Sequence, residues 1–165
     1  MPAVQNMNSH FSRVASVYRH IRTTDGEPIA FISETLKDLP EVKAADVACG
    51  AGRYDLPLFH HLNNLHLTCI DINEAMLEQV SDYLTSHGIT NIRTIKGDGN
   101  DIPLEDNSMD CVSTFNAIHH FDFEGQIKPV AAYSKVPDII SFTHCKCTSD
   151  VFSVPLDFQD ILTPP

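Results

Sequence analysis

The segment from residue 45 to residue 54, Ala-Asp-Val-Ala-Cys-Gly-Ala-Gly-Arg-Tyr, constrains the fold of this chain more than any other segment. An apolar run ends at Asp46, and a turn of small residues follows it. Gly50 and Gly52 lack Cβ atoms and tolerate positive φ, so the backbone can turn sharply and approach a ligand before a helix begins. The pattern predicts a strand, a turn and a helix that together hold a nucleotide-like ligand.

The charge around this turn favours one kind of ligand over another. A dinucleotide site has the pattern G-x-G-x-x-G, with the pyrophosphate against the helix N-terminus. Asp55 stands where the third glycine would be, and carboxylates at Asp46 and Asp55 would repel a pyrophosphate. S-adenosylmethionine (SAM) has no phosphate and carries two cationic groups, so acids attract it. A nicotinamide-dependent oxidoreductase is therefore disfavoured.

Residues 46–52 resemble motif I of the class I SAM-dependent methyltransferases, which is an acid followed by three alternating glycines. Ala48 takes the place of the first glycine. The resemblance implies SAM as cofactor and assigns four residues to the loop that holds its methionine moiety. These residues are Asp46, Ala48, Gly50 and Gly52.

Two further acids follow predicted strands. The apolar run 65–70 leads to Asp71, 19 residues after Gly52, and an acid at about that distance is placed to bind ribose hydroxyls. The family likeness assigns Ile72 to the adenine. A third strand, 92–96, precedes Asp98 and Gly99. The same likeness assigns Asp98 to the adenine amino group and the Gly99 N–H to the ring.

Residues 109–121 resemble motif IV of the same family, a fourth strand and the segment that faces the methyl group. Asn116, His119 and His120 would border the transfer site. A histidine titrates near neutral pH and is suited to act as general base. The alternative interpretation is that one histidine packs under the next helix and the other is solvated. The closest likeness is to small methyltransferases grouped with ubiquinone/menaquinone-biosynthesis C-methyltransferases, over about residues 10–143.

In this family an N-terminal helix folds over the cofactor. The resemblance therefore implies that Tyr18 approaches the methionyl end of SAM and that Arg22 pairs with its carboxylate. The alternative is an amphipathic surface helix without ligand contacts.

The alternation of helices and strands predicts an α/β fold, a Rossmann-like parallel sheet with helices on both faces. We expect a single domain over 1–165, with a helical lead-in at 1–40, a SAM-binding core at 43–143 and an irregular tail at 144–165. The family's final antiparallel hairpin has no candidate in that tail. A fifth strand at 139–143 would then be an exposed sheet edge, and homodimerisation is one way to cover it.

Local signals predict several elements within the core. Strands are expected at 43–48, 65–70 and 92–96, and a crossover helix at 53–62. Asn73 is expected to cap the next helix, which Gly88 should end.

The composition narrows the classes of molecule that this chain is expected to bind. Eleven Lys and Arg against 22 Asp and Glu give a formal charge of −11, which argues against a nucleic-acid substrate and for a small-molecule acceptor. No run of 18 apolar residues exists, so no membrane span is predicted, and no secretory signal is visible; a cytoplasmic protein is the default.

The cysteine usage is typical of a reduced compartment. Five cysteines are an odd number, and the first three lie within or beside predicted strands. His144, Cys145 and Cys147 lack a second paired group at zinc-finger spacing, so no metal is predicted.

The preferred hypothesis is a SAM-dependent methyltransferase that acts on a small molecule. The alternative, which the degraded C-terminal part supports, is a non-catalytic methyltransferase-like domain that binds SAM or S-adenosylhomocysteine weakly or serves as a partner subunit.

Overall fold

The computed structural model describes residues 2–18, 20 and 24–117, and the account below concerns these. Helices and strands alternate along most of this part of the chain, as the sequence predicts. The elements in chain order are α1 (Pro2–Tyr18), α2 (Glu27–Leu36), β1 (Val42–Val47), α3 (Asp55–His61), β2 (Leu65–Asp71), α4 (Glu74–Ser86), β3 (Ile92–Lys96) and β4 (Cys111–Ser113).

The four strands form one parallel sheet in the order β3-β2-β1-β4. The chain runs outward from β1 through β2 to β3 and then returns to the other side of β1. The strand order therefore reverses beside β1, and ligands of open α/β sheets bind at such a switch point, beyond the carboxyl ends of the strands. The loop that follows β1 begins at this place.

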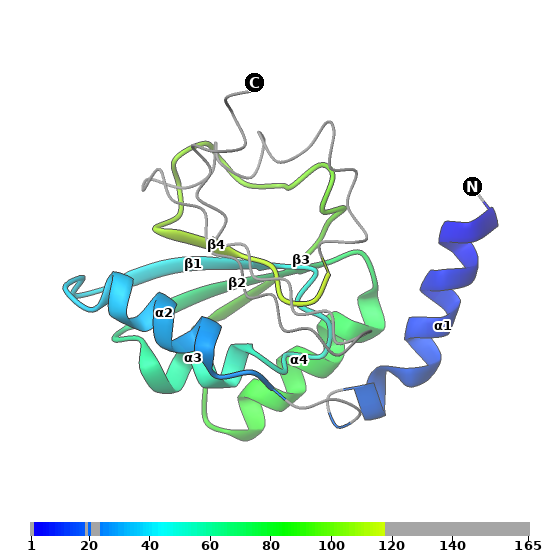
Figure 1. Ribbon diagram of the computed structural model, residues 1–165. Coiled ribbons are helices and arrows are strands. Elements are labelled where there is room, and N and C mark those ends of the chain that lie inside the picture. Colours follow the sequence, from blue (N-terminus) through cyan, green and yellow to red (C-terminus); the bar gives the residue numbers. More distant parts are fainter. Residues whose placement is uncertain (1, 19, 21–23, 118–165) are drawn as a thin grey trace.

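Helices α2, α3 and α4 lie on one face of the sheet (Figure 1). Side chains alternate between the two faces of a strand, and those of Ala44, Leu67 and Cys69 belong to the core under these helices. The opposite face buries a smaller apolar cluster that the loop after β3 helps to cover. This cluster consists of Ala45, Val47, Ile70, Ile102 and Val112.

The caps of α4 confirm the local predictions. The side chain of Asn73 accepts a hydrogen bond from the Met76 N–H, 3.3 Å away. At the other end Gly88 adopts φ 77°, and the N–H of Ile89 bonds to the Leu84 carbonyl over 3.0 Å. This is a Schellman ending, which favours glycine because the residue is left-handed.

Helix α1 lies within the helical lead-in expected at 1–40 and packs at the end of the sheet where the loop after β1 lies. Ala15 is buried in a small cluster with Ala51 and Met76. The Asn73 side-chain amide donates to the Ser12 hydroxyl over 3.0 Å. One asparagine thus caps α4 and fastens α1 to it.

The predicted fifth strand, the missing final hairpin and the irregular tail fall outside the described residues and stay predictions. The same holds for the sheet edge through which a homodimer was expected.

Candidate functional site

The loop after β1 has a left-handed backbone at each position where the family motif has glycine. Ala48, Gly50 and Gly52 adopt φ of 58°, 58° and 81°. The Cys49 N–H donates to the Ile70 carbonyl over 3.1 Å, which ties the loop to β2. Glycine is the residue that adopts such φ values at little cost. The glycines of the motif are therefore explained by the left-handed backbone of the loop. Of the three left-handed residues, Ala48 is the one whose conformation is strained.

Replacing Ala48 with glycine should consequently not destabilise the protein, although glycine usually does. A left-handed alanine costs about 1–2 kcal/mol, which glycine would not incur. Glycine loses more chain entropy on folding, and this loss cancels about 0.5–1 kcal/mol of that gain. We expect Ala48→Gly to raise the free energy of unfolding by about 0.5 kcal/mol in urea denaturation. Ala30→Gly, on an exposed position of α2, should instead lower it by about 1 kcal/mol. Equal losses in the two variants would contradict this prediction.

Asp71 ends β2 and fixes the glycine loop. Its Oδ2 accepts the Gly50 N–H over 2.9 Å and its Oδ1 accepts the Asn73 N–H over 2.8 Å. Burial raises the pKa of Asp71, and these backbone N–H groups, with that of Ile72, counteract the rise. A carboxylate offers about four acceptor sites, so both oxygens can accept further hydrogen bonds. Ile72, beside it, is an exposed apolar side chain.

Asp46 and Asp55 are buried beneath the loop. Both are fully buried, and Asp46 accepts a hydrogen bond from the Ser113 hydroxyl over 3.1 Å. Burial, together with the neighbouring Asp55, raises the pKa of Asp46 well above its usual range. Burial raises the pKa of Asp55 to about 7, against the lowering effect of Asp46 and Cys69. Near neutral pH the pair retains protons, so it contributes less negative charge than the sequence suggested.

Asp98 stands at the end of β3, one strand beyond Asp71. It is exposed, and its Oδ1 accepts the Asn100 N–H over 2.9 Å in a tight turn that also contains Gly99. The chain can turn back here because Gly97 has no side chain, since a Cβ would lie 2.8 Å from Pro103 Cδ. Asp98 thus presents a carboxylate to solvent at the carboxyl end of the sheet.

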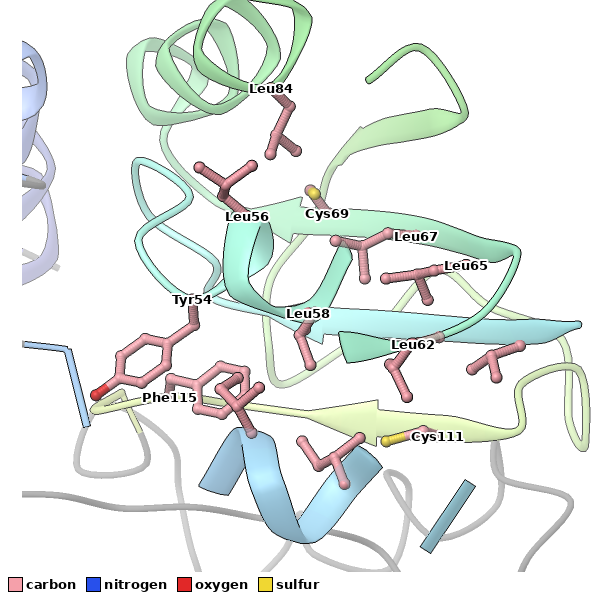
Figure 2. Packing of buried hydrophobic residues seen from close by; sticks show 14 of the residues in the cluster. Tyr54, Leu56, Leu58, Leu62, Leu65, Leu67, Cys69, Leu84, Cys111 and Phe115 are labelled. Atoms are coloured by element: carbon pink, nitrogen blue, oxygen red, sulfur yellow. The ribbon is translucent and has the colours of Figure 1, made fainter. Parts of the chain in front are cut away.

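Tyr54 joins three parts of the site, and the sequence reasoning gave it no role. Its ring stacks on that of Phe115, with centroids 4.3 Å apart and planes at 7° (Figure 2). Its hydroxyl accepts the Asp25 N–H over 3.4 Å and the Asn116 side-chain N–H over 3.2 Å. Asn116 has a left-handed φ of 57°. The sequence signal for this role of Tyr54 is the position of an aromatic residue two places after Gly52.

The structure brings some predicted residues together and leaves others apart. Gly50 and Asp71 are in direct contact, and Asp98 follows on the adjacent strand. Tyr18 is the last residue of α1. Arg22, His119 and His120 fall outside the described residues, so their roles stay predictions.

These residues fit an adenosine cofactor better than a pyrophosphate. The carboxylate of Asp71, the exposed apolar side chain of Ile72 and a loop without Cβ atoms at two positions lie at the switch point of the sheet. Within the described ranges, no helix combines the length and the apolar character that a membrane crossing requires.

Comparisons with known proteins point the same way. A family model described as a methyltransferase domain matches residues 44–136. The uncharacterized methyltransferase YcgJ of Bacillus subtilis (strain 168) is 28% identical over 129 residues, which are 76% of this chain and 49% of that protein. Demethylmenaquinone methyltransferase of Staphylococcus aureus (strain MRSA252) is 36% identical over 73 residues, 44% of this chain and 30% of that protein. The chain thus spans half the length of these relatives or less.

Solved structures share the fold. The crystal structure of YcgJ from Bacillus subtilis superposes with a TM-score of 0.58 at 23% identity, covering 67% of this chain and 47% of that one. A SAM-dependent methyltransferase from Aquifex aeolicus gives 0.59 at 22% identity, covering 77% and 66%. The predicted Rossmann-like class, a parallel sheet with helices on both sides, is confirmed, and SAM is supported as the cofactor. Since the family model covers more than half of its residues, this chain belongs to the methyltransferase domain family.

Proposed function

We propose that this chain binds SAM at the carboxyl end of its sheet and transfers the methyl group to a small-molecule acceptor. The observation that carries the proposal is the contact between Gly50 and Asp71, where the glycine loop and the acid after β2 meet at the switch point. This contact would give a nucleotide-like ligand both a close approach to the backbone and an acceptor for its ribose hydroxyls.

When bound, SAM supplies a methyl group on a sulfonium for in-line transfer to a nucleophile. The task of the chain is then to bind and to align, which is a large part of catalysis for two reactants. In this proposal Asp71 accepts the ribose hydroxyls, Ile72 lies against the adenine and Asp98 accepts its amino group. The loop 48–52 surrounds the methionyl part.

The acceptor is proposed to be small because the chain carries a formal charge of −11, which disfavours a phosphate backbone. Asn116, His119 and His120 would border the acceptor, with a histidine as general base. A cytoplasmic location and the absence of nucleic-acid and membrane partners are part of the same proposal. The second candidate is a domain that binds SAM or S-adenosylhomocysteine without catalysis.

Asp71→Ala should weaken SAM binding by more than about 100-fold in isothermal titration calorimetry. Two hydrogen bonds to a charged acceptor are lost, each worth about 1.5–3 kcal/mol. Wild-type protein at a SAM concentration 100 times the dissociation constant should be stabilised by about 2.7 kcal/mol. NAD should give no such stabilisation.

Two variants serve as controls for this experiment. Asp82→Ala removes an exposed acid of α4 and should leave binding unchanged. Asp98→Ala removes an exposed acid whose side chain accepts the Asn100 N–H within its own turn, and it should weaken binding about tenfold without unfolding the protein. If wild-type protein binds neither SAM nor S-adenosylhomocysteine, the cofactor assignment is wrong. Binding without transfer of a radiolabelled methyl group to any small nucleophile would favour the non-catalytic domain.

A further inference from the structure

Three metal-ligating side chains from separate parts of the chain meet under the glycine loop. Cys49 belongs to the loop after β1, Cys69 to β2 and Asp55 to the first turn of α3. Their two Sγ atoms and a carboxylate oxygen all lie within 4.8 Å of one another. Figure 2 shows Cys69 on β2 directed toward the side where α3 lies. All three cysteines among the described residues are free thiols.

Asp55 is a buried acid of this cluster that a cation would stabilise. Its side chain is 0% exposed, and neither oxygen accepts a hydrogen bond from a described residue. The Asp46 carboxyl is buried beside it, and the Cys69 Sγ lies within 4.8 Å of a carboxylate oxygen of Asp55. A buried carboxylate without a partner is costly, so such groups are normally paired, protonated or bound to a metal.

The donor set selects the kind of cation. Two thiolates and one carboxylate are ligands for Zn²⁺ or a similar thiophilic ion, whereas Mg²⁺ and Ca²⁺ require shells of oxygen atoms. Zn–S distances of about 2.3 Å in a tetrahedron place two sulfurs about 3.8 Å apart. The cluster is near this spacing already. Asp46, which is buried against Asp55, or a water would provide the fourth ligand.

We propose that Cys49, Asp55 and Cys69 bind one thiophilic divalent cation, with Zn²⁺ as the best match, between β1, β2 and α3. The site lies directly beneath the loop 48–52, since Asp55 Oδ2 would lie 3.3 Å from a Cβ added at Gly52. A Cys49–Cys69 disulfide is the rival product of the same two thiols. The disulfide would leave both oxygens of Asp55 without a partner, while the cation satisfies all three side chains.

The test uses the full chain without an affinity tag, reduced, treated with chelator and then titrated with Zn²⁺ against a chromophoric chelator. We expect one tightly bound Zn²⁺ per chain. Co²⁺ in its place should give the intense thiolate-to-metal charge-transfer absorption of a tetrahedral site. Cys69→Ser should weaken Zn²⁺ binding more than about 100-fold, because even the loss of an outer partner of a metal ligand costs about 10–100-fold.

Two control variants locate the ion. Cys111→Ser alters a buried thiol of β4 that is outside the cluster and should bind Zn²⁺ like wild type. Cys145→Ser combined with Cys147→Ser should also retain binding. Loss of binding in the latter variant would move the site to the C-terminal cysteines and overturn the proposal.

The wild-type spectrum decides the matter even if Cys69→Ser does not fold. Absence of the Co²⁺ charge-transfer band in the reduced full chain would overturn the proposal. These measurements are made without SAM, and SAM binding is measured on chelator-treated protein. Failure of the metal site and failure of the proposed function are therefore distinguishable.

Discussion

Replacing Gly52 with alanine should lower the free energy of unfolding by about 3 kcal/mol, measured by urea denaturation. A Cβ at this position would lie 2.6 Å from Val80 Cγ2, at a backbone φ of +81°. The left-handed conformation costs an alanine about 1–2 kcal/mol, and forcing a methyl group into a filled core costs about 1–3 kcal/mol. Val80 is fully buried on α4, so it has little room to move away.

Gly88→Ala separates the two contributions. Gly88 has nearly the same φ, +77°, but nothing lies within 4 Å of an added Cβ. This variant should lose only the conformational part, about 0.5 kcal/mol once the lower chain entropy of alanine is counted. In addition, Val80→Ala should cost less in the Gly52→Ala background than in wild type, because the smaller side chain relieves the overlap. Equal losses for Gly52→Ala and Gly88→Ala would mean that contact with Val80 is unimportant.

The stability of metal-free protein should fall as the pH rises from about 4 to about 7. Burial raises the pKa of Asp55 from 3.8 to about 7, so the folded protein holds a proton that the unfolded chain releases. The stabilisation is complete below the unfolded pKa and is lost as the pH passes the folded pKa. The slope is at most about 1.4 kcal/mol per pH unit, and the total is on the order of 4 kcal/mol. Urea denaturation in the presence of chelator, across this pH range, measures the fall.

Asp55→Asn should flatten this profile, because the amide keeps the shape of the side chain and does not titrate. Asp82→Asn, on the exposed side of α4, should leave the slope as in wild type. The ionisable groups beside Asp55 are Asp46, Cys49 and Cys69, and Asp71 in turn acts on Asp46. A slope that survives in Asp55→Asn would assign the proton to one of these groups.

Local chemistry made much of the fold predictable. The strand 92–96 was predicted with the bounds that the structure has, since a short run rich in β-branched residues lies between turns. Asn73 and Gly88 were assigned correctly as caps because capping depends on the residue and its immediate neighbours. The contact between Gly50 and Asp71 agrees with the motif spacing. Signals that act over a few residues were thus sufficient to predict these strands and caps.

The burial of individual side chains was less predictable from the sequence. Asp55 was interpreted as a charge beside the ligand, but the start of α3 turns it inward to Asp46 and Cys69. Its burial depends on how α3 packs on β2, which no local pattern encodes. Tyr54 illustrates the same limit, because its partners Asp25 and Asn116 are distant in sequence. Such contacts follow only from the tertiary fold.

The two hydrogen bonds that Asp71 accepts have a consequence for the rate at which a ligand binds. They hold the Gly50 N–H and the start of α4 in position before any cofactor arrives. The glycine loop is therefore preorganised, and the entropy of ordering it is lost during folding instead of during association. Stopped-flow binding of SAM should accordingly show a rate that rises linearly with concentration, without a plateau from a slow loop rearrangement.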